Sequence, residues 1–294
     1  MKMHAIEVKN LTKSYGKQVV LDNISFHIDE GEIVGFIGPN GAGKSTLMKC
    51  ICNLIPIDNG RITIFGKDLY KDREEALQLQ SSMIEGPGLF ENLNGWQNLD
   101  LFASLKNVSK ERMQTMIEYT GLGKQIYKNT SAYSVGMKQR LALAIALLNE
   151  PKFMMLDEPM NGLDPAGVLE LRRELKQMVE RDHMTLLISS HQLNEIEKIA
   201  DRIIYINEGK IHKIEKEELK HLYRFRLNKE LVNLDIPGSP VFVKEGIYEF
   251  HTKDENEFAD VIHALSKEDI RILEITQLQK DLEDEYRRIY EVDV

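Results

Sequence analysis

The chain has 294 residues, of which 42% are hydrophobic and 29% are charged, and this balance is typical of folded globular proteins rather than disordered ones. Its formal net charge is -9, and residues 221–294 hold 10 Lys and Arg against 17 Asp and Glu, so most of the excess acid lies in the last quarter. Because binding DNA or RNA requires a basic surface, this charge predicts no nucleic-acid partner, although a single nucleotide can still be bound locally.

Cysteine usage and hydropathy predict a cytoplasmic location. Cys50 and Cys52 are the only cysteines, and on a helix they would point in different directions, which indicates free thiols in a reducing compartment. Residues 1–10 lack the apolar stretch of a signal peptide. The longest apolar run, Leu141–Leu148, has eight residues, far fewer than the roughly 20 needed to span a bilayer. A membrane role is therefore expected to depend on a partner protein.

The first part of the chain reads as short strands followed by a strand, a loop and a helix. Alternating and β-rich runs predict strands near Ile6, Val19 and Ile24. The apolar run Ile33–Ile37 predicts a buried strand that enters a glycine-rich loop, and a helix is expected over Lys44–Leu54.

That loop matches the phosphate-binding pattern G-x-x-x-x-G-K-[ST]. Its glycines let backbone N–H groups turn toward phosphate oxygens, and the following helix adds the positive end of its dipole. Lys44 is expected to neutralise the β- and γ-phosphates during catalysis, and Ser45 to ligate Mg²⁺. The alternative is a glycine turn without a ligand, against which the flanking strand and helix argue. The predicted loop residues are Gly38, Pro39, Asn40, Gly41, Ala42, Gly43, Lys44, Ser45 and Thr46.

A helical segment and further strands follow. Residues 94–149 have helical character, and Asn94 and Gln97 have the spacing of a capping box at its start. Strands on both sides of this block indicate a mostly parallel α/β core with a helical subdomain of about residues 85–150 set into it. The later predicted strands are Phe153–Leu156, Thr185–Ser189 and Arg202–Ile206.

Two acids follow the first of these later strands. Asp157 and Glu158 are expected at the carboxyl edge of the sheet, where ligands gather in open α/β folds. Asp157 would hold Mg²⁺, and Glu158 would polarise the attacking water as general base. Alone, such a pair is more often a plain strand end. Together with the phosphate loop, it predicts a nucleotide-hydrolysing site.

A second helix N-terminus also has the character of an anion site. Ser134 and the backbone of Val135 and Gly136 open a helix that runs on toward Leu148. The alternative is a capped helix with no ligand.

The order of these motifs resembles the ABC transporter ATP-binding family over residues 6–222. Residues 133–137 stand where that family has its signature L-S-G-G-Q, and they match its second and fourth positions. The resemblance implies that this segment contacts the γ-phosphate of ATP bound by the other protomer, in a homodimer or a pair of ATPase subunits. A methionine in fifth place lacks the hydrogen bonds of a glutamine side chain, which puts that contact in doubt. The implied contact residues are Ser134, Val135, Gly136 and Met137.

The same resemblance implies roles for three further residues. Tyr15 corresponds to the aromatic residue that stacks on adenine, and Asp164 belongs to the loop along the dimer seam. His191 follows a predicted strand, as does the family's catalytic histidine that contacts the γ-phosphate. Ordinary packing for Tyr15 and a structural role for His191 are the alternatives.

One position departs from the family in an informative way. Glu85 stands before Gly86-Pro87-Gly88-Leu89-Phe90, where the family has a glutamine. Either side chain offers oxygen to Mg²⁺ or to water, so Glu85 is expected to serve as a metal and nucleotide ligand, while its charge alters the coupling to the partner. Together with residues 134–140, this feature is similar to the branch that exports bacitracin-like or lantibiotic peptides.

The fold class implied is α/β: a P-loop NTPase core with a mostly parallel sheet, an antiparallel β subdomain and an inserted helical subdomain, plus a small C-terminal α+β domain. Residues 1–222 are expected to form the ATP-binding domain and residues 223–294 an accessory domain. The latter is predicted to contain strands, a helix over Glu255–Ser266 and a last helix near residues 278–289. A regulatory or dimer-supporting role and a simple solvated cap are both open.

The function expected from these motifs is that of an ATP-hydrolysing transport subunit. Residues 85–96 of the helical subdomain would grip an integral membrane permease, which would handle a peptide-type cargo. The chain would lie in the cytoplasm, on the inner face of the membrane. A soluble ABC ATPase acting in translation or on nucleic acid is the main alternative, but such proteins favour basic surfaces and either two ATPase units or a long coiled coil. A P-loop kinase or GTPase would not require the signature or His191.

Overall fold

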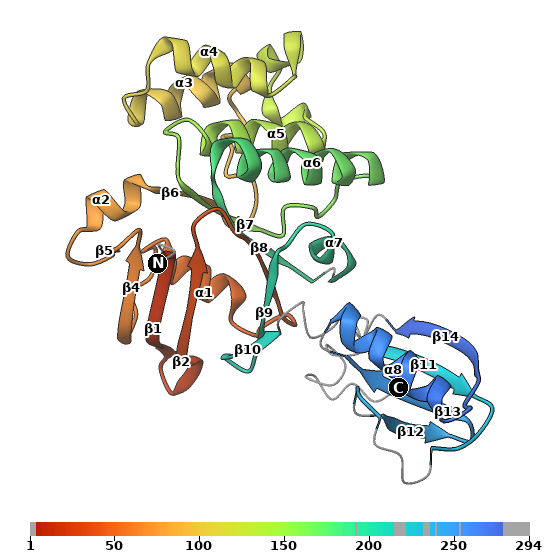
Figure 1. The fold of residues 1–294 in the computed structure, drawn as a ribbon. Helices are drawn as coiled ribbons and strands as arrows, with labels where there is room; N and C mark the ends of the chain where they lie inside the picture. The colour runs from red at the N-terminus through yellow and green to blue at the C-terminus, as the bar shows by residue number, and fades with distance from the viewer. Residues whose placement is uncertain are drawn as a thin grey trace. The chain divides into compact units, whose positions relative to one another are not determined.

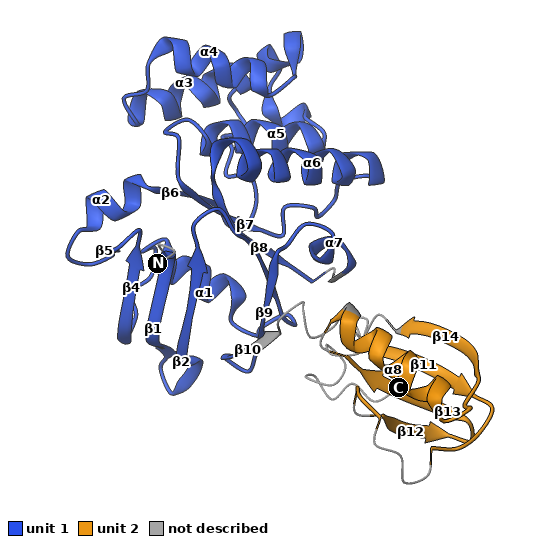
Figure 2. Cartoon of the chain, in the orientation of Figure 1, with its two compact units in different colours: residues 1–213 blue, residues 214–294 orange. Residues whose placement is uncertain are grey.

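The chain folds into two compact units, residues 1–213 and residues 214–294, which Figure 2 shows in different colours. The computed structural model describes residues 4–191, 193–214, 222–231, 236–238, 240–252 and 254–278. The domain boundary expected after Leu222 falls at the start of the first strand of the second unit, so the division lies slightly earlier in the chain than the sequence indicated.

The first unit is built around a six-stranded sheet with the order β10-β9-β3-β8-β7-β6. The pairs β3–β8, β3–β9, β7–β8 and β6–β7 are parallel, which confirms the predicted mostly parallel core. The central strands β3 and β8 are buried along their whole length, as parallel strands between layers of helices require. The strands are β3 (Ile33–Ile37), β6 (Gln80–Met83), β7 (Phe153–Asp157), β8 (Thr185–Ser190), β9 (Arg202–Asn207) and β10 (Lys210–Ile214).

A second sheet of the same unit is antiparallel and has the order β2-β1-β4-β5. Its long strands β1 and β2 alternate buried and exposed residues along part of their length, because one face packs on the core while the other meets solvent. The buried faces of both sheets share one hydrophobic cluster with the helix α1 (Lys44–Ile51). The strands are β1 (His4–Tyr15), β2 (Gln18–Asp29), β4 (Asn59–Ile64) and β5 (Lys67–Asp68).

A helical subdomain is inserted between β6 and β7, and in Figure 1 it lies at the end of the unit away from β1 and β2. The capping box predicted at Asn94 and Gln97 is present and opens its first helix. The long helical segment is broken where Asn107 and Gly121 adopt positive φ angles of 53° and 61°. Its helices are α3 (Gly95–Leu105), α4 (Lys110–Tyr119) and α5 (Val135–Ala146), with 3₁₀ turns at Gly123–Tyr127 and Thr130–Ala132.

Three further helices complete the described part of the first unit: α2 (Arg73–Gln78), α6 (Pro165–Asp182) and α7 (Leu193–Glu197). Of these, α6 follows β7 and lies beside α5 (Figure 1). Within the described ranges, no helix combines the length and the apolar character needed to cross a membrane.

The second unit consists of an antiparallel sheet with the order β12-β13-β11-β14 and one helix. The alternation predicted from Tyr223 onward gives β11 a buried face, whose Phe225 packs against Phe250 with ring centroids 4.7 Å apart. This arrangement fits the expected α+β class, while the predicted last helix lies mainly outside the described residues. The elements are β11 (Leu222–Leu227), β12 (Val241–Lys244), β13 (Ile247–His251), α8 (Glu255–Lys267) and β14 (Ile272–Leu278).

Candidate functional site

The loop between β3 and α1 wraps around the side chain of Lys44. This side chain is only 7% exposed, and its Nζ donates hydrogen bonds to the carbonyl oxygens of Gly38, at 2.5 Å, and Pro39, at 3.2 Å. Burial lowers the pKa of Lys44, and the carboxylates of Glu158 and Asp157 act in the opposite direction. A buried ammonium held by backbone oxygens and facing two acids is prepared to meet phosphate oxygens.

Two glycines of this loop are required by its backbone geometry. Gly43 has a φ of 105°, a conformation that other residues rarely adopt, and it is the N-cap of α1. A Cβ atom on Gly38 would lie 2.4 Å from the carbonyl oxygen of Ile206 on β9. The glycine spacing therefore has a structural cause in this loop as well as a role in approaching phosphate.

The loop and the ends of two strands enclose a cavity of about 220 Å³. It contains most of the residues predicted for phosphate binding, with Val20 of β2 as an addition that the sequence did not indicate. Gly38 and Ala42 are not in its wall: Gly38 contributes its carbonyl to Lys44, and Ala42 is buried. The lining residues are Val20, Pro39, Asn40, Gly41, Gly43, Lys44, Ser45, Thr46, Asp157 and Glu158.

Hydroxyl and carboxylate oxygens meet at one side of this cavity. The hydroxyl of Ser45 donates to Asp157 Oδ2 at 3.2 Å, although the two residues are 112 positions apart in the sequence. Mg²⁺ prefers such hard oxygen ligands and usually keeps several waters, so this pair fits its chemistry. The hydroxyl of Ser189 on β8 donates to Asp157 Oδ1 at 2.5 Å and orients the carboxylate. Ser189 was not singled out in the sequence, although its place at a strand end is a signal for such a role.

Glu158 and His191 are brought together by the ends of β7 and β8. His191 Nδ1 lies 2.8 Å from Glu158 Oε2, and the His191 backbone N–H donates to the same oxygen at 3.3 Å. Glu158 has a left-handed φ of 52°, and its own N–H donates to Ser189 Oγ at 3.0 Å. A strained backbone fixed by neighbouring groups is common where a side chain must point into a functional site. The Glu158 carboxylate therefore lies at the edge of the phosphate cavity and contacts His191.

Tyr15 ends the strand β1, and its side chain is 52% exposed. The ammonium of Lys13 lies 5.4 Å from the centre of its ring, within range of a cation–π contact. An exposed aromatic ring with this position is available to stack on a planar base. Its assignment as the adenine contact stays a prediction.

The predicted signature segment lies in a different part of the unit. Ser134 is the N-cap of α5, and its Oγ accepts a hydrogen bond from the Met137 N–H at 3.3 Å. Asp164 caps α6 in the same way, accepting from the Gly167 N–H at 2.8 Å. Both helix starts border a second cavity, of about 610 Å³, between α5 and α6. Residues of this cavity include Ser134, Val135, Gly136, Met137, Gly162, Leu163, Asp164 and Gly167.

The two cavities have no lining residue in common. In the described part of one chain, the phosphate loop and the signature segment therefore line different cavities.

Glu85 lies outside the wall of the phosphate cavity and forms an ion pair instead. Its Oε1 lies 2.5 Å from the Nζ of Lys49 on α1, and its side chain is 65% exposed. The hydrogen bond that Lys49 donates to Glu85 is the main reason why the pKa of Lys49 is raised. Lys49 is thus a partner that the sequence did not reveal, and the role of Glu85 as a metal ligand stays a prediction.

Comparison with known proteins agrees with this geometry. Residues 21–161 match the family model described as ABC transporter. The chain is 36% identical to the bacitracin transport ATP-binding protein BcrA of Enterococcus faecalis, covering 97% of this chain and 96% of that protein. It is 42% identical to the lantibiotic transport ATP-binding protein SrtF of Streptococcus pyogenes, covering 72% of this chain and 90% of that protein.

Solved structures show the same relationship. The ATP-binding cassette MJ0796, whose dimeric post-hydrolysis state was solved with ADP and Pi, superimposes with a TM-score of 0.64 and 27% identity over 71% of this chain and 98% of that chain. The nucleotide bound there and the family's activity agree with the phosphate cavity and its adjoining acids. The chain therefore belongs to the ATP-binding subunits of ABC transporters, ATPases that dimerise and work with a membrane permease.

Proposed function

We propose that two copies of this chain close head to tail on two ATP·Mg²⁺ and thereby drive a permease that exports peptide antibiotics. One observation carries the dimer arrangement: the phosphate loop and the signature helix line separate cavities of the same unit. A triphosphate held by Lys44 would consequently meet the helix start at Ser134 only from a second copy. The dimeric state of the ADP- and Pi-bound cassette MJ0796 supports this reading.

Different residues of one chain would bind the metal, bind the phosphates and activate the water. Ser45 and Asp157, whose oxygens lie 3.2 Å apart, would hold Mg²⁺, which supplies positive charge against the phosphates. Lys44 would neutralise phosphate oxygens from the buried side of the loop. Glu158 would accept a proton from the attacking water, and His191 at 2.8 Å would hold that carboxylate in place and contact the γ-phosphate.

The dimer seam would be completed by the signature and the neighbouring helix. The N-terminus of α5 offers the positive end of its dipole, and N–H groups of its first turn would contact the γ-phosphate held by the partner copy. Asp164 at the start of α6 lies along the same cavity and would face the partner copy. Tyr15 would stack on the adenine from the end of β1.

The cargo assignment rests on the relatives. The similarity to the bacitracin transport protein BcrA extends over 97% of this chain, so it includes most of the second unit as well as the first. The lantibiotic transport protein SrtF shares 42% identity over 72% of the chain. We therefore assign the subunit to self-protection against such peptides, acting from the cytoplasmic side of the membrane through its permease.

This function is tested by removing the subunit from its cell and measuring growth in bacitracin and in a lantibiotic. Loss of the chain is expected to lower the tolerated concentration of at least one of these peptides, and restoring the wild-type chain is expected to recover it. The Lys44→Ala variant should fail to recover it because ATP is no longer held. Equal tolerance with and without the chain for both peptides would contradict the cargo assignment while leaving the ATPase assignment intact.

A further inference from the structure

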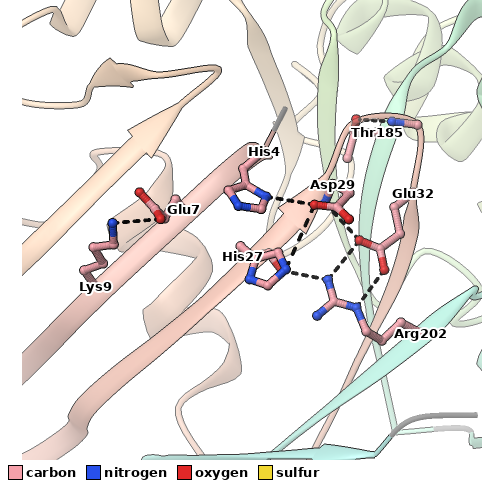
Figure 3. A network of polar contacts seen from close by, with 9 residues as sticks. His4, Glu7, Lys9, His27, Asp29, Glu32, Thr185 and Arg202 are labelled. Atoms are coloured by element: carbon pink, nitrogen blue, oxygen red, sulfur yellow. Dashed lines mark hydrogen bonds and ion pairs between the residues drawn. The ribbon is translucent and has the colours of Figure 1, made fainter. Parts of the chain in front are cut away.

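Two histidines and an aspartate cluster on the antiparallel sheet of the first unit. His4 begins β1, while His27 and Asp29 lie near the end of β2, and Figure 3 shows their side chains pointing toward one another. The register of the two strands pairs His4 directly with Asp29. One ligand atom from each side chain lies within 4.8 Å of the other two, and this is the one such group found in the described part of the chain.

The distances within this cluster match the spacing of ligands around one metal ion. His4 Nδ1 lies 2.8 Å and His27 Nε2 lies 4.0 Å from Asp29 Oδ1. In a tetrahedral zinc site with bonds of about 2.0–2.2 Å, neighbouring ligand atoms are about 3.3–3.6 Å apart. The two distances to Asp29 Oδ1 lie on either side of this value, and all three ligand atoms lie within 4.8 Å of one another.

The backbone beneath the cluster is fixed by neighbouring strands. Glu32 Oε2 accepts a hydrogen bond from the Asp29 N–H at 2.9 Å, and the Gly31 N–H donates to Thr185 Oγ1 of β8 at 3.0 Å. Arg202 of β9 donates to the His27 carbonyl oxygen at 2.7 Å. Figure 3 shows these supporting residues beside the cluster. Ligand residues held in place in this way lose little further freedom when they bind an ion.

The surrounding charge is compatible with a cation. The nearest guanidinium, that of Arg202, is paired with both carboxylate oxygens of Glu32 at 2.7 and 2.9 Å. Glu32 therefore offsets much of the positive charge of this guanidinium beside the cluster. The side chains of His4, His27 and Asp29 are 42%, 41% and 26% exposed, so an ion can enter from solvent.

We propose that His4, His27 and Asp29 bind a divalent transition cation of the zinc class, with water in the fourth position. Two imidazoles and one carboxylate are the ligands such ions prefer, whereas Mg²⁺ and Ca²⁺ favour oxygen alone. The ion would clamp β1 to β2. Tyr15, at the other end of β1, would be on the order of 35 Å away along an extended strand, so this site is separate from the nucleotide.

The test is a titration of the nucleotide-free full-length chain with Zn²⁺ as the only transition metal. The buffer contains excess Mg²⁺ to occupy oxygen-rich sites. We expect one Zn²⁺ per chain in calorimetry, and a rise in the unfolding temperature with added Zn²⁺ because the ion binds only the folded strands. Co²⁺ in place of Zn²⁺ should give the intense visible absorption of a tetrahedral site with nitrogen ligands.

The variants His27→Gln and His4→Gln should each weaken Zn²⁺ binding at least tenfold and abolish the cobalt spectrum. The exposed His263, on α8 of the second unit, provides the matched control, and His263→Gln should bind as the wild type does. All three variants should keep the Mg²⁺-dependent ATPase rate, which shows that they fold. The proposal is overturned if the wild-type chain does not bind Zn²⁺, or if His27→Gln and His4→Gln both bind it with wild-type affinity.

Discussion

The phosphate loop and the signature segment of the first unit differ in how many neighbouring ligand-binding groups one chain supplies. Around the phosphate loop, Lys44 and Ser45 from the start of α1 and Asp157 and Glu158 from the end of β7 converge on one cavity. Around the signature, Ser134 satisfies the start of its own helix, and the nearest cavity is lined by α5 and α6 without any residue of the phosphate loop. The first region is expected to hold ATP from one side, and the second offers a helix N-terminus beside a different cavity.

Under the proposed function, the chain carries two halves of a composite site. Changes in the phosphate-loop region should alter nucleotide binding and hydrolysis even in an isolated protomer. Changes in the signature region should act only when two copies meet. The variants that follow separate these two classes of effect.

The largest effect is expected from Glu158→Gln. The amide keeps the size of the side chain but cannot accept the proton of the attacking water, so ATP turnover should fall by about 10²- to 10⁴-fold. ATP should still bind, and the variant should accumulate as a dimer in size-exclusion chromatography. The exposed Glu180 on α6 provides the control, because Glu180→Gln should leave turnover unchanged. A Glu158→Gln chain that stays monomeric in ATP would refute the composite arrangement.

The next effect is expected from Lys44→Ala. The variant loses the buried ammonium of the phosphate loop, and charged hydrogen bonds of the kind it is expected to form with phosphates contribute about 1.5–3 kcal/mol. The affinity for ATP should therefore fall on the order of 10- to 100-fold, as measured by fluorescent-nucleotide binding. Lys176→Ala, at an exposed position of α6, should bind as the wild type does. Unchanged affinity in Lys44→Ala would place the phosphates elsewhere.

A smaller and more selective effect is expected from Ser134→Ala. Removing a serine N-cap lowers the free energy of unfolding by about 1 kcal/mol, because the Met137 N–H loses its acceptor. Ser109 caps α4 in the same subdomain, accepting from the Arg112 N–H at 3.1 Å, so Ser109→Ala should cost a similar amount. In the Glu158→Gln background, only Ser134→Ala should also weaken the ATP-dependent dimer in analytical ultracentrifugation.

The two serines thus give a direct comparison. If both variants lose the same stability and dimerise equally well, the signature helix is only a capped helix. If Ser134→Ala alone impairs the dimer, its hydroxyl has a role beyond its own helix.

Many of the strands and helix starts could be predicted because the local pattern of apolar and capping residues determines them. The strand Ile33–Ile37 and the capping box at Asn94 were predicted as they are found. Helix ends were less accurate: α1 was expected to continue to Leu54 but stops at Ile51, because Asn53 takes a left-handed φ of 55°. Such an ending depends on packing around the helix as well as on residue type.

The parts of the site that escaped prediction depend on which strands become neighbours. Ser189 orients Asp157 because β7 and β8 pair in parallel with these two residues in register. Lys49 meets Glu85, 36 residues away in the sequence, only after α1 packs near the end of β6. A single sequence predicts the strands but does not give their order or register, so these contacts require the structure.

The smallest effect on catalysis is expected from Glu85→Gln, which restores the residue type typical of the family. The change removes the exposed ion pair between Glu85 and Lys49. Because such pairs contribute little to stability, the unfolding temperature should hardly change. Glu91→Gln is the matched control, because Glu91 forms a similarly exposed pair with Lys138 at 2.7 Å. The ATPase rate of Glu85→Gln should stay near that of the wild type, while peptide tolerance in cells should change. If hydrolysis is abolished in Glu85→Gln but not in Glu91→Gln, the carboxylate of Glu85 is itself required at the metal. Glu85 would then belong to the phosphate-loop region rather than to the coupling with the permease.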